Sequence, residues 1–101
     1  MHDQELVDEL VASGHVGEQQ VMLWRDVAGL MAVFDAIGRD GVSAVVKIDG
    51  ARPDAAMYTV VVSGPRLGEA FFRQDGSDLP ALLSAAIAFY RAAAWSGPHT
   101  G

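Results

Sequence analysis

The chain has 101 residues, no cysteine and a formal net charge of −6, and half of its residues are hydrophobic. This length and apolar content predict a single globular domain and argue against intrinsic disorder. A chain without cysteine has neither disulfides nor thiolate metal ligands. Proteins bind nucleic acid mainly through Lys and Arg, so we expect no direct nucleic-acid partner for an acidic chain with 7 scattered basic residues.

The N-terminal sequence MHDQELVDEL argues against export or membrane insertion. It is acidic with apolar residues interspersed, whereas a signal peptide has a basic start followed by an apolar run. The chain also contains no apolar run of about 18–20 residues, the length that spans a bilayer. We therefore expect a cytoplasmic protein with no membrane partner.

The first element in chain order is a short acidic helix from Asp3 to Ala12. Its apolar residues form one stripe, with acidic residues around it. The stripe consists of Leu6, Val7, Leu10 and Val11. Ser13-Gly14 predicts the end of this helix, and the following residues up to Gly17 predict a flexible joint. We therefore expect residues 1–16 to form a short acidic helix and a joint.

A second, longer helix is predicted from about Glu18. Apolar residues recur there every three or four positions, the spacing of an amphipathic helix. They are Val21, Trp24, Val27, Leu30, Met31, Phe34 and Ile37. Gly38 and Gly41 predict the end of the helix, and Arg39 places a cation near the last carbonyl groups. The alternative is a short strand over VMLW, with Asp26 as the N-cap of a shorter helix. We favour one continuous helix because the apolar stripe runs through this segment.

Three β-strands are predicted between Val42 and Asp75. Alternating side chains rich in β-branched residues predict strands over 42–49, 57–63 and 69–74, separated by the turn sequences DGARPD and GPRLG. In the third strand, Phe71 and Phe72 point to opposite faces. The face that we expect two helices to bury comprises Val42, Ala44, Val46, Ile48, Tyr58, Val60 and Val62.

A last helix is predicted after the turn DGSD. Ser77 or Asp78 can accept the free backbone N–H groups of its first turn, where Pro80 is tolerated. Its apolar side comprises Leu79, Leu82, Leu83, Ala86, Ile87, Tyr90 and Ala93. Gly97-Pro98 predicts its end, and we expect residues 97–101 to be a disordered tail. The predicted fold class is α+β: one domain over residues 1–101, with a three-stranded antiparallel sheet flanked by two helices in the order α-β-β-β-α, and an extra short N-terminal helix.

No motif in the sequence indicates catalysis, a metal or a cofactor. A general base must be held rigidly near the proton that it removes, whereas His2 and His99 lie near the chain ends and His15 lies in a glycine-flanked joint. DGSD lacks the spacing and the closing Glu of an EF-hand calcium loop, and GPRLG leads into a strand and has no Lys of a phosphate loop. We predict a non-enzymatic protein with no catalytic residue, no metal site and no cofactor.

The order of the elements resembles the double-stranded RNA-binding domain. GARPDAAMYTVVVSG is similar to the first loop and second strand of that family. The family grips phosphate with a basic cluster at the start of its last helix, but this chain has QDGSDLPA there, with Asp75 and Asp78 in place of lysines. The resemblance therefore implies the fold without RNA binding. The layout of residues 17–95 also resembles small α-β-β-β-α sandwich proteins of phages and mobile elements.

The second face of the predicted sheet carries four apolar residues. They are Val45, Met57, Val61 and Phe71. A sheet face that meets only solvent does not need such a cluster. Two explanations stay open. The N-terminal helix folds across this face, or the face meets a partner, which is either a second copy or another protein.

We predict a small acidic protein-binding module whose partner has a basic surface. The acidic residues that we expect to contact this partner are Asp8, Glu9, Asp54 and Asp78. Inhibitors of nucleic-acid-binding enzymes, such as anti-CRISPR or toxin-immunity proteins, are of this type by analogy of size and charge. The alternative is a structural homodimer or assembly subunit that uses the second sheet face.

Overall fold

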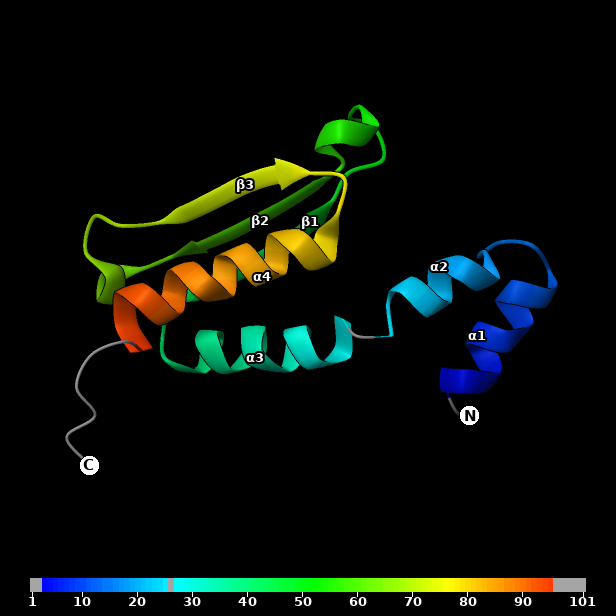
Figure 1. Cartoon of the computed structure of the whole chain (residues 1–101), viewed down its shortest axis with the longest axis horizontal. Helices are drawn as coiled ribbons and strands as arrows, with labels where there is room; N and C mark the ends of the chain where they lie inside the picture. Colours follow the sequence, from blue (N-terminus) through cyan, green and yellow to red (C-terminus); the bar gives the residue numbers. More distant parts are fainter. Residues whose placement is uncertain (1–2, 26, 96–101) are drawn as a thin grey trace.

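The computed structural model describes residues 3–25 and 27–95 of the chain, with the elements labelled in Figure 1. The helices are α1 (Asp3–Ala12), α2 (Glu18–Leu23), α3 (Val27–Arg39) and α4 (Leu79–Tyr90). The strands β1 (Ser43–Ile48), β2 (Tyr58–Ser63) and β3 (Phe72–Gly76) form one antiparallel sheet in the order β1-β2-β3. The predicted α+β class, with helices flanking the sheet and an extra N-terminal helix, is confirmed.

Alternation along the strands gives the sheet an inner and an outer face. Val60 and Val62 of β2 are fully buried on the inner face. Val61 points the opposite way and lies across from Val45 of β1 and Arg73 of β3. The outer face is made of Ser43, Val45, Lys47, Thr59, Val61, Ser63, Arg73 and Asp75, the positions that share the parity of Val61 in the strand register.

The core lies between the inner face and two helices on the same side of the sheet, α3 and α4 (Figure 1). Its buried side chains come from α3, the sheet, the residue just before β1, and α4. Burying each large one contributes about 1.5–3 kcal/mol. They are Val27, Phe34, Ile37, Val42, Val60, Val62, Phe72, Leu79, Leu82, Leu83, Ala86 and Tyr90. The predicted inner-face and last-helix residues therefore supply much of this core.

Ile48 and the third strand depart from the prediction. Ile48 is 56% exposed rather than buried, because it ends an edge strand of the sheet. β3 spans Phe72–Gly76 rather than 69–74, so Asp75 belongs to a strand and not to a turn. Two adjacent phenylalanines fit either face, and alternation alone therefore could not fix where this strand begins.

The start of α4 agrees with the prediction. The side chain of Asp78 accepts a hydrogen bond from the backbone N–H of Ala81 at 3.1 Å, and Pro80 lies in the first turn. Beyond Tyr90 the chain forms a π-helical turn, Arg91–Trp95. The hydroxyl of Tyr90 and the ring N–H of Trp95 both donate to Asp40, at 3.0 and 2.7 Å, which ties this end of α4 to the end of α3.

The predicted continuous helix from Glu18 is wrong. The segment forms α2 and α3, and because Val21–Leu23 are helical, the strand alternative is wrong too. The same apolar spacing fits one helix or two helices in sequence. α3 also runs through Gly38 and ends before Gly41, whose φ of +97° favours glycine. Asp26, the alternative N-cap, lies outside the described residues.

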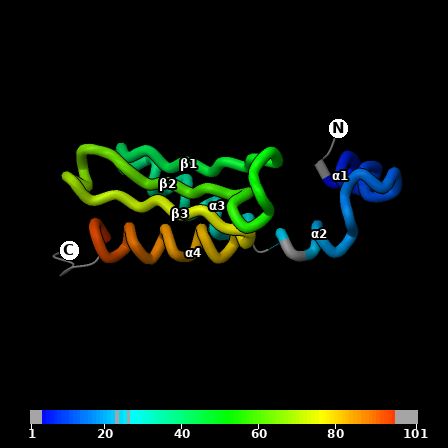
Figure 2. Tube along the Cα trace, turned by 90° about the horizontal axis from the view of Figure 1, so that it is seen from above, coloured from blue at the N-terminus to red at the C-terminus, as the bar shows by residue number. Residues whose placement is uncertain are grey.

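The N-terminal arm, residues 3–25, lies beyond one end of the core (Figures 1 and 2). α1 ends as predicted: Gly14 has a φ of +81°, and the N–H of His15 donates to the carbonyl of Leu10 at 3.0 Å, a glycine-terminated helix end. Trp24 packs against the core, its ring centroid 6.2 Å from that of Tyr58. The arm does not fold across the outer face.

The arm makes the molecule long for its size. The radius of gyration is 16.0 Å and the longest extent is 51 Å. A compact domain of this length has a radius of gyration of about 13 Å. No helix in the described ranges is long and apolar enough to cross a membrane. His2, His99, Gly97-Pro98 and the tail predicted over 97–101 lie outside the described residues.

Candidate protein-interaction surfaces

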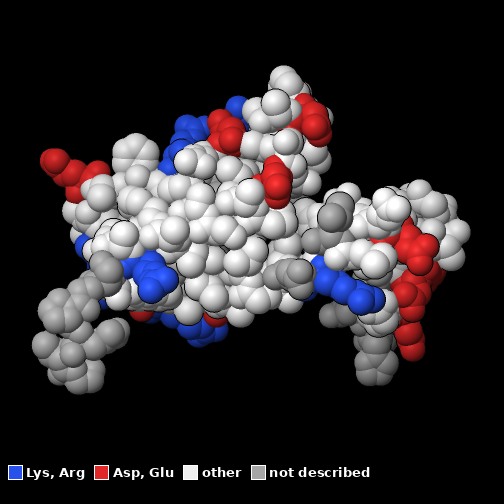
Figure 3. Space-filling view, in the orientation of Figure 1, with Lys and Arg blue, Asp and Glu red and all other residues white. Residues whose placement is uncertain are grey.

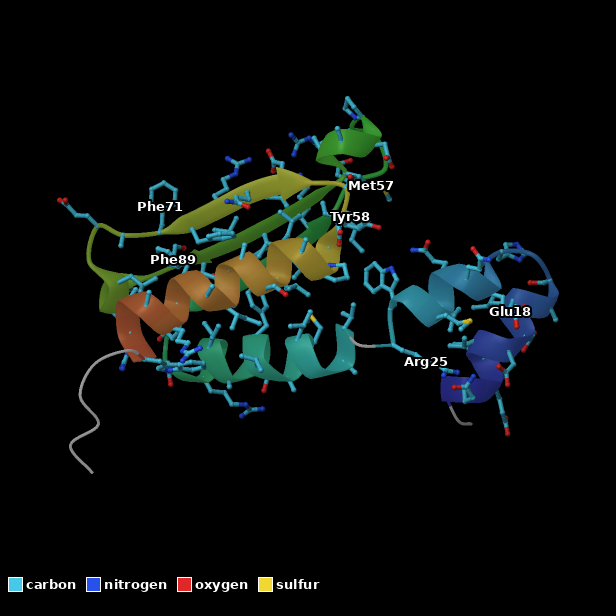
Figure 4. The ribbon with its side chains drawn as sticks, in the orientation of Figure 1. Glu18, Arg25, Met57, Tyr58, Phe71 and Phe89 are labelled. Atoms are coloured by element: carbon cyan, nitrogen blue, oxygen red, sulfur yellow. The ribbon has the colours of Figure 1, made fainter. Side chains whose placement is uncertain are left out.

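The outer face is open in the described structure. Figure 2 looks onto the sheet with α3 behind it, and neither α1 nor α2 crosses the strands. Val45 is 44% exposed and Phe71 is 64% exposed. Val61 is half-buried and pairs with Val45 in the strand register. In Figure 4 the ring of Phe71 points away from the helices. We call Val45, Val61 and Phe71 the outer patch.

Met57 does not belong to the outer patch. It is half-buried and lies at the opposite end of the sheet from Phe71 (Figure 4). The row Lys47–Thr59–Asp75 of the strand register separates it from Val61. The structure thus brings together three of the four predicted outer-face residues and leaves the fourth apart.

A polar network closes the Met57 end of the outer face. Arg52, from the loop after β1, donates to Thr59 at 3.2 Å and forms a salt bridge with Asp75 at 3.3 Å. Thr59 is buried and donates its hydroxyl to Asp75 at 2.5 Å. The Thr59 hydroxyl, and after it the Arg52 guanidinium, hold the pKa of Asp75 below its ordinary value.

The outer face carries more basic than acidic side chains, although the chain is acidic. Lys47 lies 3.4 Å from Asp49, whose pKa is lowered mainly by the backbone N–H of Ala51. Arg52 is paired with Asp75, as above. Arg73, directly opposite Val61, forms no salt bridge with the described residues. One guanidinium beside the outer patch is therefore available to a carboxylate of a partner.

The arm carries a second uncovered apolar surface. A groove of about 490 Å³ runs between α1, α2 and the start of α3, and we call it the arm groove. Its apolar lining comprises Val7, Leu10, Val16, Val21, Trp24 and Ala28. Two more large side chains of the arm face solvent: Leu6 is 45% exposed and Met22 is 58% exposed. Helices this short are marginal alone in water. Within the described structure, Trp24 is a residue of the arm that packs against the core.

Acidic side chains surround the apolar stripe of α1. Glu5, Asp8 and Glu9 are exposed, and Asp8 accepts a hydrogen bond from Gln4 at 2.8 Å. Figure 3 shows these red side chains gathered over α1 at one end of the molecule. Two of the four predicted acidic contact residues, Asp8 and Glu9, therefore lie on the arm.

The other two predicted acidic contact residues, Asp54 and Asp78, line a notch between α2 and the start of α4. The notch has a volume of about 360 Å³, and its remaining walls include Trp24 and Tyr58. Asp78 is also the N-cap of α4, which accounts for one of its oxygens. Neither carboxylate forms a salt bridge with the described Lys and Arg residues. The notch joins aromatic rings to unpaired carboxylates, a combination that attracts cations.

One serine and one histidine lie within hydrogen-bond distance of each other on the arm. Ser13 Oγ is 2.8 Å from Nδ1 of His15. The same hydroxyl lies 3.1 Å from the carbonyl of Leu10, and the tautomer of His15 decides which of the two side chains donates. Both side chains are exposed in the turn after α1, an arrangement that caps a helix. Residues 3–25 and 27–95 contain no group of three His, Asp or Glu side chains placed to hold a metal ion.

Comparison of the chain with models of protein families, with curated proteins and with solved structures finds no match.

Some features of these surfaces were not predicted from the sequence. The arm groove depends on the angle between α1 and α2, which no periodicity encodes. The salt bridge of Arg52 joins residues 23 positions apart, so local patterns do not indicate it. For the arm groove, Trp24 is the residue that could have indicated it, because a tryptophan between two helices can contact both of them.

Proposed function

We propose that this chain is a non-enzymatic structural module whose copies associate through the outer face of the sheet. The observation that carries the proposal is the outer patch, which no described segment of the chain covers. Val45 and Phe71 are 44% and 64% exposed, beside the unpaired guanidinium of Arg73. Contiguous apolar patches bordered by polar residues are typical of protein contacts.

A second copy is favoured over an unrelated partner by charge. The chain has a net charge of −6, whereas its outer face carries Lys47 and Arg73 against Asp75. An acidic surface complements the outer face, and each copy of this chain provides one.

The test is Val61→Glu, which places a carboxylate at the centre of the outer patch. Size-exclusion chromatography with light scattering should show association for the wild type and a loss of association for the variant. Ala36→Glu, on an exposed position of α3, adds the same charge elsewhere and should leave association unchanged. Val45→Glu, at a more exposed site, repeats the test if Val61→Glu impairs folding. Equal association of all four proteins would refute the proposal.

A second candidate function is an acidic inhibitor-type module that binds a basic protein. The notch between Asp54 and Asp78 favours it, because Trp24 and Tyr58 offer ring faces to a Lys or Arg side chain. Binding here would block a basic site on the partner by occupying it with carboxylates and aromatic rings.

Oligolysine is the probe for this candidate. Surface carboxylates each contribute about 0.5–1 kcal/mol to such contacts, so Asp54→Asn with Asp78→Asn should weaken binding by about fivefold to thirtyfold. Asparagine keeps the N-cap of α4. The control, Asp35→Asn with Glu69→Gln, removes the same charge away from the notch. Isothermal titration that gives equal affinities for both double variants would exclude the notch.

A further inference from the structure

Two surfaces of this chain carry exposed apolar side chains that no other part of the described structure covers. The arm presents Leu6, and the sheet presents Val45 and Phe71, all between 44% and 64% exposed. The arm lies beyond the end of its own core, at the level of the helices, whereas the outer face lies on the opposite side of the sheet (Figures 1 and 2). One copy therefore leaves both surfaces open.

The charges beside the two surfaces are opposite. On α1, Leu6 and Leu10 are four residues apart and lie on one side of the helix, with Glu5 and Glu9 each one position before them. On the sheet, the row Val45–Val61–Arg73 places a guanidinium next to an apolar pair. The arm thus has an apolar stripe bordered by carboxylates, and the sheet has an apolar row bordered by a cation, so the two surfaces are complementary in charge.

We propose that the arm of a second copy of this chain lies across the outer face of the sheet, reciprocally in a two-fold dimer. Leu6 and Leu10 of one copy cover Val45 and Val61 of the other, and Glu9 approaches Arg73. The inference rests on the proposed association through the outer face, and it names the element that makes the contact. The alternative arrangement is a dimer in which the outer faces of the two copies pack directly against each other.

The overall shape supports reciprocal exchange. A radius of gyration of 16.0 Å, against about 13 Å for a compact domain of this length, shows how far the arm projects. A two-fold operation repeats the same contact twice, so each dimer covers both arms and both sheets. Such a dimer is closed, because the Leu6–Leu10 stripe and the outer face of each copy are both engaged by the other copy.

Paramagnetic broadening between copies tests the arrangement. Because the chain has no cysteine, Ala12→Cys adds one attachment point for a nitroxide, in α1 and off the Leu6–Leu10 stripe. Nitroxide-labelled Ala12→Cys chains without isotope are mixed with isotope-labelled wild type. We expect broadening of the backbone amides of Val45, Val61 and Arg73 in the wild-type copy. The control label, Ala32→Cys on the exposed side of α3, should leave these amides unbroadened.

A charge exchange gives an independent readout. Glu9→Arg and Arg73→Glu should each raise the dimer dissociation constant by about fivefold, and the double variant should restore it, since the opposite charges meet again. A dimer that dissociates on Val61→Glu but shows no broadening from Ala12→Cys would overturn the arm exchange and leave association through the outer face standing. A dimer unaffected by Val61→Glu would overturn the proposed association itself.

Discussion

Asp75 links the loop after β1 to the third strand. Its carboxylate accepts from the Thr59 hydroxyl and pairs with the guanidinium of Arg52, 3.3 Å away. Both partners stabilise the charged form, so the pKa of Asp75 is lower in the folded chain than in the unfolded one. The contribution of Asp75 to folding is complete above the unfolded pKa of about 3.9 and is lost as the pH falls through the folded value.

Asp75→Asn should therefore change how folding stability depends on pH. We expect the wild type to be more stable than the variant at pH 7, with a difference that shrinks below about pH 4 as Asp75 takes up a proton. Urea unfolding at several pH values measures this difference. Asp54→Asn is the control, because the Asp54 side chain forms no hydrogen bond or salt bridge with the described residues. A difference that is constant from pH 7 to pH 3 would contradict the assigned network.

Asp78 has a structural role that can be separated from its charge. Its side chain accepts the N–H of Ala81, one of the unpaired donors at the start of α4. Asp78→Ala should lower the free energy of unfolding by about 1 kcal/mol, whereas Asp78→Asn should be close to neutral because asparagine caps equally well. Urea denaturation distinguishes the two. Equal losses for both variants would show that charge, and not capping, stabilises this helix end.

The helices of the arm are less well packed than the core, so we expect their backbone amides to be less protected. α1 has 10 residues and α2 has 6, and helices this short are marginal without packing. We expect amides of α1 and α2 in dilute protein to exchange hydrogen faster than those of β2 and α4. Raising the protein concentration should slow exchange in the arm, since a second copy covers it. Arm exchange rates that do not depend on concentration would contradict this expectation.

The sequence predicts the elements well where a single hydrophobic periodicity, such as the two-residue alternation of a strand, dominates the segment. Alternation in YTVVVS is enough to send Val60 and Val62 to the core and Val61 to the outer face, as the structure has them. The end of α1 at Ser13-Gly14 follows from the positive φ that glycine supplies. Capping by Asp78 follows from residue type and position. These are local effects, and local residues encode them.

The remaining features depend on contacts between distant residues. The break between α2 and α3 keeps the apolar spacing of Val21, Trp24 and Val27, so periodicity does not reveal it. Met57 is separated from the outer patch by the row Lys47–Thr59–Asp75 of the sheet. Arg52, from the loop after β1, bonds Thr59 and Asp75 of this row. Asp54 and Asp78 are brought into one notch by the folding of the whole chain. Strand parity decides that Val45 and Val61 lie on the outer face, whereas Phe71 precedes the first residue of β3 and its position does not follow from parity.

At the scale of the molecule, the acidic arm and the basic side of the sheet lie apart within one chain. Figure 3 shows the carboxylates of α1 at one end, away from the layered core. The short helical arm extends the molecule to 51 Å and exposes Leu6 and Met22 to solvent. In the proposed dimer, association of two copies would remove exposed apolar side chains of the arm and the outer face from water, and the opposite charges would orient the copies.

Sedimentation equilibrium of the wild-type chain over a wide concentration range tests this association most directly. The single chain has a mass of 10.7 kDa. We predict an apparent mass that rises with concentration and levels off at twice that value, because a reciprocal contact closes at two copies. A mass that stays at 10.7 kDa at every concentration would contradict association through the outer face.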